Sequence, residues 1–142
     1  MNILISACLM GVNCRYDGSS MRLKELEQLS KKHHLIPICP EQLGGLETPR
    51  EAAEILNGKV VTKSGTDVTH AFVKGAKEVL SLALFYDCSI VILKERSPSC
   101  GNREVYDGSF RSQLVKGEGF TAALLKQNNI RVLGESEISK LV

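Results

Sequence analysis

The sequence has almost no excess charge, since 18 Lys and Arg residues against 16 Asp and Glu residues leave a formal net charge of +2 at pH 7. A broad nucleic-acid surface neutralises several phosphates along one face, so we expect no extended nucleic-acid interface. A site for one phosphate or one nucleotide is compatible with this balance.

Targeting signals and long apolar stretches are also missing. Residues 2–9 are mostly apolar, but they lack a basic leader and a small-residue cleavage pattern and are too short to span a bilayer. We therefore expect a cytoplasmic protein that does not contact a membrane. With 142 residues, 43% of them hydrophobic, and no repeat or low-complexity tract, the chain is predicted to form a single domain over residues 1–142.

The five cysteines include no CxxC pair and are odd in number: Cys8, Cys14, Cys39, Cys88 and Cys100. In a reducing cytosol this pattern argues against a disulfide scaffold. Metal binding, catalysis or burial as small apolar side chains are the roles left for these cysteines. Which cysteine has which role depends on where each falls in the fold.

Short apolar runs alternate with helical patterns along the chain. The runs at 3–5, 35–38, 90–93 and 130–133 indicate buried strands, and 59–62 indicates a small edge strand or hairpin. Helices are expected at 20–32 and 120–128, and the longest one is expected to begin at 66 or 67 and to carry an apolar face from Ala71 to Ala83. Strands that alternate with helices predict an α/β fold, a three-layer domain with a small, mostly parallel, Rossmann-like sheet.

One further helix is expected between Thr48 and Asn57. Thr48 suits the N-cap, Pro49 the first helical position, and Glu51 stands three residues after the cap, as in a capping box. Helix 20–32 has Leu23, Leu26 and Leu29 as its apolar stripe and a serine available as its N-cap.

Three cysteines fall where predicted strands stop: Cys8, Cys39 and Cys100. Because carboxyl ends of parallel strands meet at one edge of a sheet, these thiols are predicted to converge, and a shared soft metal, zinc or an iron-sulfur cluster, is the economical explanation. Three unrelated thiols are the alternative. Cys14 is either a fourth ligand that closes the site or a loop thiol beside it, and Cys88, at the start of a strand, is predicted to lie in the core.

Polar residues surround the same predicted loops. Glu41 suits a general acid or base if burial raises its pKa, and an ion pair with an arginine is the alternative. Ser97 and Ser99 either donate hydrogen bonds to a substrate or brace their loop. The candidates for substrate or phosphate contact are Arg15, Tyr16, Arg50 and Lys94, and for Arg50 and Lys94 the alternative is a solvated charge.

Four ordered blocks of this sequence resemble a bacterial family known as domain of unknown function 523, whose characterised members are thiouracil desulfidases. The blocks are ISACLMGVNCRYDG (5–18), PICPEQLGGLETPREAAEI (37–55), GTDVTHAFVKGA (65–76) and LKERSPSCGNREVYDGSF (93–110). The resemblance runs from Ile5 to about Glu135.

The resemblance implies a [4Fe-4S] cluster on Cys8, Cys39 and Cys100 with the fourth iron open. It implies that sulfur is removed from a small thiolated pyrimidine or nucleotide, such as 4-thiouracil or 4-thiouridine monophosphate, to give the uracil product and sulfide. Glu41 would move protons, and Ser97 and Ser99 would assist. The competing hypothesis is a non-catalytic metal- or sulfur-binding module in which Cys14 closes a four-thiolate site.

Overall fold

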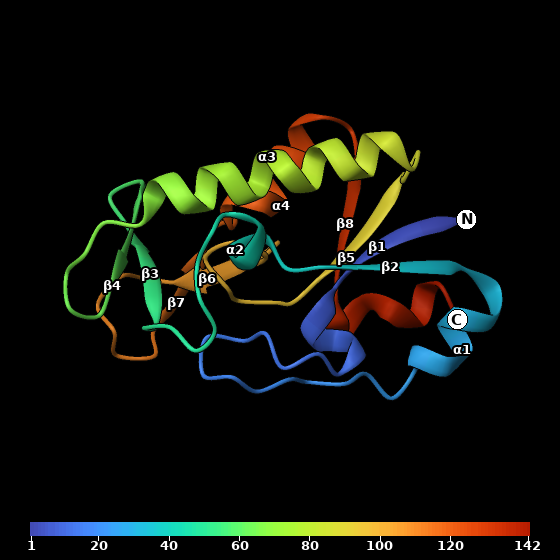
Figure 1. Ribbon diagram of the computed structural model, residues 1–142, viewed down its shortest axis with the longest axis horizontal. Helices are drawn as coiled ribbons and strands as arrows, with labels where there is room; N and C mark the ends of the chain where they lie inside the picture. Colours follow the sequence, from blue (N-terminus) through green and yellow to red (C-terminus); the bar gives the residue numbers. More distant parts are fainter.

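A four-stranded parallel sheet in the order β2-β1-β5-β8 forms the centre of the protein, for which a computed structural model describes residues 1–142 (Figure 1). Its strands are β1 (Asn2–Ser6), β2 (His34–Ile38), β5 (Ile90–Leu93) and β8 (Arg131–Gly134). The predicted α/β fold with a parallel sheet is confirmed. From β1 the chain adds β2 on one side and then β5 and β8 on the other, which makes the β1–β5 pair the topological switch point of the sheet.

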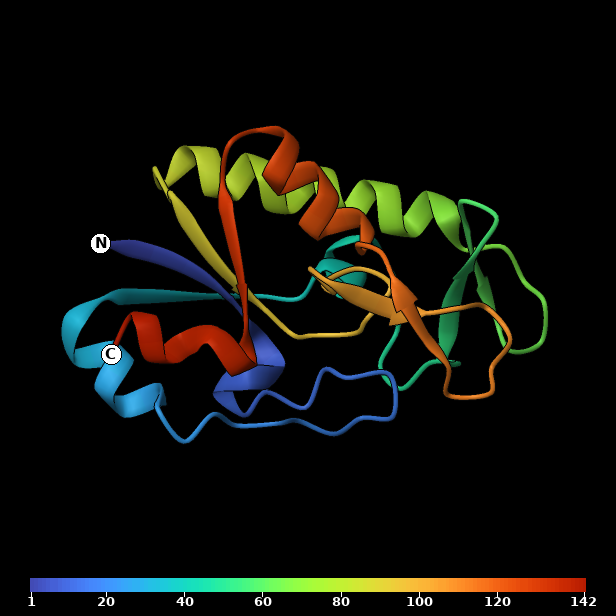
Figure 2. The ribbon, with the colours of Figure 1, turned by 180° about the vertical axis from the view of Figure 1, so that it is seen from behind.

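Helical segments cover both faces of the sheet (Figures 1 and 2). One face packs on α3 (Thr69–Phe85) and α4 (Phe120–Gln127), and the other on α1 (Leu26–Lys32) and the 3-10 helices η1 (Ala7–Met10) and η2 (Glu135–Lys140).

Successive side chains of β1 point to opposite faces of the sheet, so this one strand contributes to the hydrophobic cores on both faces. Leu4 points into the α3–α4 core, whereas Ile3 and Ile5 point into the core beneath α1. All three are fully buried, and burial of each such side chain contributes about 1.5–3 kcal/mol. No helix of the structure has the length and apolarity that a membrane span requires.

The prediction of a helix over residues 48–57 is wrong. The segment contains β3 (Ala53–Leu56), which pairs in antiparallel fashion with β4 (Lys59–Thr62), the small strand predicted there. Asn57 and Gly58 form the two-residue turn between them with φ of 51° and 76°. Asn-Gly is strongly favoured in such hairpin turns, and this signal outweighed the apparent capping box.

Helix α1 begins six residues later than expected, and Ser20 does not cap it. The backbone amides of Met21 and Leu23 donate to the carbonyls of Cys8 and Leu9 at 2.9 Å, which holds this segment extended beside η1. The hairpin of β6 (Glu104–Tyr106) and β7 (Leu114–Lys116), and the short α2 (Pro40–Leu43), were not predicted from the sequence. Helices α3 and α4 lie close to where the pattern placed them.

Helix α2 touches α3 through two glycines. A Cβ atom on Gly75 would lie 2.0 Å from the carbonyl oxygen of Pro40, and one on Gly44 would lie 2.0 Å from that of Ala71. Because backbone cannot yield as a flexible side chain does, α2 has to move away if either glycine gains a methyl group.

We expect Gly75→Ala to lower the free energy of unfolding by about 2 kcal/mol or more, measured by urea denaturation. Lys77→Ala, at an exposed position of the same helix, is the matched control and should change stability by less than about 0.5 kcal/mol. Equal stability of the two variants would contradict the close packing.

Glu137 of η2 holds the carboxyl-terminal segment to the loop between β5 and β6. Its Oε1 accepts hydrogen bonds from Asn102 Nδ2 and the Gly134 amide, both at 3.1 Å, and its Oε2 pairs with Arg103 Nη2 at 2.8 Å. Burial alone would raise the pKa of this carboxyl, but these hydrogen bonds and the positive charge of Arg103 hold it below its usual value.

A carboxyl group whose pKa is lower in the native state than in the unfolded chain stabilises the fold at pH values above its unfolded-state pKa. This stabilisation is lost as the pH falls through the native-state pKa. We therefore expect Glu137→Gln to cost about 1–2 kcal/mol at pH 7, with the difference from the unsubstituted protein shrinking below about pH 4. Urea denaturation across pH tests this, with the exposed Glu104→Gln as control. A cost that does not change with pH would refute the ionic contribution.

Candidate functional site

The three cysteines predicted to converge line one cavity at the carboxyl edge of the sheet. Cys8 lies in η1 directly after β1, Cys39 stands between β2 and α2, and Cys100 follows β5. All three border a cavity of about 810 Å³. This is the side of the switch point where open α/β sheets bind ligands.

Cys14 is a fourth thiol in the same cavity. It is 2% exposed, and Cys39 Sγ lies 3.9 Å from its carbonyl oxygen. Contact with Cys39 lowers its pKa, but contact with Cys8, burial and nearby negative charge outweigh this and raise it to about 11. Cys88 is buried in the core beneath α3, as expected from its place at the start of a strand.

Two of the other cavity thiols are also hard to ionise. The pKa of Cys39 is raised by contact with Cys14, by burial and by the charge of Glu41, and that of Cys100 is raised chiefly by burial and by Glu41. Such thiols become thiolates when a metal displaces their protons.

The donor set fits a soft metal group. Four sulfur atoms border the cavity, and thiolate is the ligand that iron-sulfur clusters and zinc prefer. No three Cys, His, Asp or Glu side chains are placed to hold a single metal ion. Which of the four cavity thiols bind metal stays a prediction.

Glu41 lies in the first turn of α2, two residues after Cys39, and lines the cavity. Its side chain is 15% exposed, and its Oε2 accepts a hydrogen bond from Arg50 Nη2 at 2.8 Å. Its Oε1 is buried and has no partner. Burial raises the pKa of this carboxyl above its usual value, although the charge and hydrogen bond of Arg50 act in the opposite direction. The raised pKa and the ion pair with an arginine, which the sequence offered as alternatives, thus occur together at Glu41.

Both terminal nitrogens of Arg50 donate hydrogen bonds to protein acceptors. Besides Glu41, its guanidinium donates to the carbonyl oxygens of Glu47 and Cys14, both at 3.1 Å, and to Thr48 Oγ1 at 3.0 Å, and its side chain is 10% exposed. This geometry makes Arg50 the residue that positions Glu41 and the loop of Cys14. Its predicted contact with a phosphate stays a prediction.

Lys94 is likewise paired within the protein. Its Nζ lies 2.8 Å from Glu135 Oε2 and 3.1 Å from the carbonyl oxygen of Glu95. Arg15 and Tyr16 line the cavity from the loop after η1, where Arg15 is half-buried without an ion pair and Tyr16 is 45% exposed. Of the four predicted contact residues, these two are the ones whose side chains stay available.

The two serines of the Cys100 loop have different surroundings. Ser97 lines the cavity, and its Oγ accepts hydrogen bonds from the backbone amides of Ser99 at 3.2 Å and Cys100 at 2.7 Å. Ser99 is fully buried behind the cavity, and its hydroxyl shares a 2.7 Å hydrogen bond with Thr121. Both therefore brace the loop, and Ser97 is the one that also borders the cavity.

Ser6 was not singled out from the sequence. Its hydroxyl accepts a hydrogen bond from the Lys94 amide at 2.9 Å and donates to Cys100 Sγ at 3.7 Å. The aromatic residues Tyr106 and Phe110 also line the cavity and were missed, because their hairpin was not predicted. The sequence signal for Ser6 was its place at the end of the first strand.

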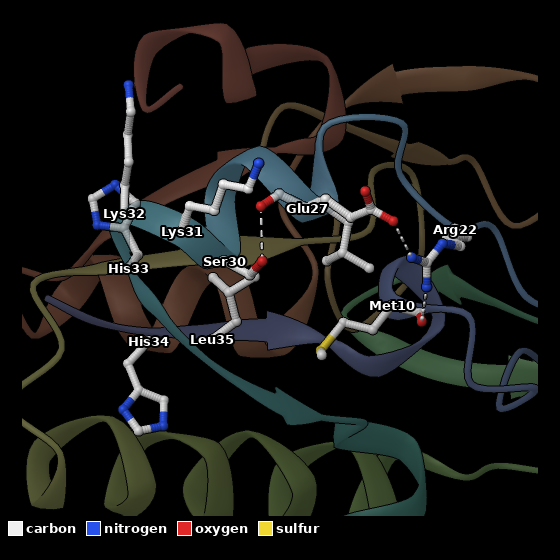
Figure 3. A pocket seen from close by; sticks show the side chains of 10 residues that line it. Met10, Arg22, Glu27, Ser30, Lys31, Lys32, His33, His34 and Leu35 are labelled. Atoms are coloured by element: carbon white, nitrogen blue, oxygen red, sulfur yellow. Dashed lines mark hydrogen bonds and ion pairs between the residues drawn. The ribbon is translucent and has the colours of Figure 1, made fainter.

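A second groove, of about 630 Å³, runs beside α1 (Figure 3). Basic side chains dominate its lining, with Lys31, Lys32 and Arg22 among them, and Arg22 is tied to Glu27 at 3.6 Å and to the carbonyl oxygen of Met10 at 3.5 Å. It contains no cysteine, so the cavity of the four thiols is the candidate active site.

Comparison with known protein families identifies the family of this chain. The model of the family described as 2-thiouracil desulfurase matches residues 3–137. The chain belongs to this family. The resemblance found in the four sequence blocks is thereby confirmed.

Two known proteins resemble the chain over nearly its whole length. The uncharacterized protein YbbK of Bacillus subtilis (strain 168) is 43% identical, in an alignment that covers 99% of each chain. The solved structure of the [4Fe-4S]-dependent thiouracil desulfidase TudS is 42% identical and superposes with a TM-score of 0.94, over 99% of this chain and 94% of that one.

Proposed function

We propose that this protein is an iron-sulfur-dependent desulfidase that removes sulfur from a thiolated uracil compound and releases sulfide. The observation that carries the proposal is one cavity that combines four thiols with a buried carboxylate oxygen lacking a partner. Membership of the 2-thiouracil desulfurase family, and the likeness to a [4Fe-4S]-dependent thiouracil desulfidase, support it.

Cys8, Cys39 and Cys100 would hold the [4Fe-4S] cluster, with Cys14 beside them. When bound, the cluster supplies a Lewis-acidic iron suited to the sulfur of the substrate. Ser6 supports this role because its hydroxyl donates a hydrogen bond to Cys100 Sγ. Hydrogen bonds of this kind orient metal ligands and tune the group that they hold.

The reaction exchanges C=S and water for C=O and hydrogen sulfide, with no net redox change. Protons must pass from the attacking water to the departing sulfur, and Glu41 is placed to carry them. Its Oε2 is fixed by Arg50, which leaves Oε1 to accept and return a proton. Ser97 orients the substrate from the cavity wall, and Ser99 keeps the loop in place.

The preferred substrates are 4-thiouracil and 4-thiouridine monophosphate. A cavity of about 810 Å³ has the size of a small-molecule site. Arg15, which has no ion pair, is the best placed cation for a phosphate, and Tyr16 lines the same cavity. Arg50 and Lys94 also line it, but each is paired with a carboxylate at 2.8 Å. We propose that the protein acts in the cytoplasm on such small molecules as a single domain of residues 1–142.

The test is to purify or reconstitute the protein without oxygen and to measure iron, acid-labile sulfide and the visible spectrum. About four irons and four sulfides per chain, followed by sulfide release from 4-thiouridine monophosphate, are the expected results. One zinc per chain with no iron after reconstitution would instead favour a binding module with a closed four-thiolate site. A loaded cluster without sulfide release from any thiolated uracil would refute the reaction but not the cofactor.

A further inference from the structure

Aromatic residues gather around the cavity. The chain has four Phe, three Tyr and no Trp, and four of these seven residues line the cavity: Tyr16, Phe72, Tyr106 and Phe110. Phe72 is a core residue at 3% exposure, and Tyr16 is 45% exposed on a loop. Tyr106 and Phe110, both half-buried, border the cavity from the β6–β7 hairpin, and we call these two the aromatic wall.

We propose that Phe110, with Tyr106 beside it, is the surface on which the flat ring of the substrate packs, and that it determines specificity for an aromatic heterocycle. The inference rests on the proposed desulfidase function, because it supplies the contact for the ring while the thiols and Glu41 face the sulfur. No residue of this hairpin has a part in the chemistry described above.

The loop that bears Phe110 is held in place by the neighbouring hairpin. Glu54 of β3 accepts hydrogen bonds at its Oε1 from the amides of Gly108 at 3.0 Å and Phe110 at 3.1 Å. A Cβ atom on Gly108 would lie 2.8 Å from the carbonyl oxygen of Ile55, so loop and strand are in direct contact. The two hairpins lie side by side at one end of the molecule (Figure 2).

Phe110 adopts a backbone conformation that its side chain does not favour. Its φ is +58°, in the left-handed region that bulky residues rarely occupy. Such a conformation costs of order 1–3 kcal/mol and persists where the surroundings impose it, typically at ligand sites. Here the hydrogen bonds from the Gly108 and Phe110 amides to Glu54 hold the loop in this conformation, which places a large apolar side chain at the edge of the cavity.

The aromatic wall is fixed relative to the cysteines. Arg96, in the loop after β5, forms a parallel bridge with Val105, the residue before Tyr106. A Cβ atom on Gly101 would lie 3.1 Å from Val105 Cγ1, so the backbone next to Cys100 also lies against the side chain of this β6 residue. A ring held against Phe110 is therefore held at a set position relative to Cys100.

The enzymatic test compares Phe110→Ala with Phe85→Ala, which removes an aromatic ring that is 79% exposed and outside the cavity. Loss of a stacked ring should raise KM for 4-thiouracil about tenfold with kcat within about twofold, and Phe85→Ala should match the unsubstituted protein. Iron and acid-labile sulfide per chain should equal those of the unsubstituted protein in both variants.

A binding test uses the absence of tryptophan. In Phe110→Trp the new indole is the only one in the chain, and its emission should change as uracil or 4-thiouracil is added. Phe85→Trp, titrated in the same way, corrects for light absorbed by the ligand and should show no further change. This readout needs no turnover and therefore reports on the aromatic wall independently of the reaction.

The outcomes separate the two proposals. If the unsubstituted protein releases sulfide but Phe110→Ala keeps its KM, the aromatic wall is refuted while the desulfidase function stands. If no sulfide is released, the function fails, and the emission of Phe110→Trp decides the aromatic wall alone: a ligand-dependent change supports it, and a response equal to that of Phe85→Trp overturns it.

Discussion

Cys39→Ala is expected to abolish the cluster, so that iron falls from about four atoms per chain to nearly none after anaerobic reconstitution. Cys39 joins β2 to α2, lines the cavity and approaches the backbone of Cys14 at 3.9 Å, so its loss removes one sulfur donor from the cavity. The same loss is expected for Cys8→Ala and Cys100→Ala. Iron and acid-labile sulfide assays with the visible spectrum measure it.

Cys88→Ala is the matched control, because its thiol is buried in the core away from the cavity. It should keep a full cluster even if stability falls. Cys14→Ser tests the ligand set itself: full iron content supports three ligands without Cys14. Loss of iron in Cys14→Ser together with a full cluster in Cys8→Ala would transfer the first ligand role to Cys14, and a full cluster in Cys39→Ala would refute the assignment altogether.

Glu41→Gln is expected to lower kcat for sulfide release by about 10²- to 10⁴-fold while iron content and KM change little. The amide still accepts a hydrogen bond from Arg50 but cannot take up and return a proton at the position of Oε1. A fall in kcat at constant iron would therefore report loss of proton transfer and not loss of the cluster.

Glu51→Gln is the control for this substitution. Glu51 also lines the cavity, but its carboxylate accepts hydrogen bonds from the backbone amide and the hydroxyl of Ser64. It should leave kcat within a few-fold of the unsubstituted value. A Glu41→Gln protein with normal turnover would remove Glu41 from the mechanism, and water or another group would have to carry the proton.

Much of the fold follows from local pattern. The apolar runs around Ile3, Ile36, Ile92 and Val132 predicted the four strands of the sheet because a buried parallel strand needs an uninterrupted apolar segment. From these strand ends the meeting of Cys8, Cys39 and Cys100 in one cavity also followed. Such inferences succeed where the deciding interaction is near in sequence or repeated along an element.

What the sequence did not reveal depends on distant contacts. The segment around Thr48 carried a helix-start signal, but pairing of β3 with β4 determined its structure. Arg50 resembled a phosphate ligand because no pattern tells which acceptors will surround a guanidinium. Phe110 could not be placed at all, since its conformation depends on Glu54, a residue of another hairpin.

The placement of the thiols on three separate strands determines the order in which the protein can be assembled. A compact CxxC motif can grip metal in an unfolded chain, but Cys8, Cys39 and Cys100 meet only after β1, β2 and β5 have paired. With these three cysteines as the proposed ligands, folding of the polypeptide would precede insertion of the cofactor, and the apoprotein would have to be folded to receive it. The cofactor would then bind the native state far better than the unfolded one and so add to its stability.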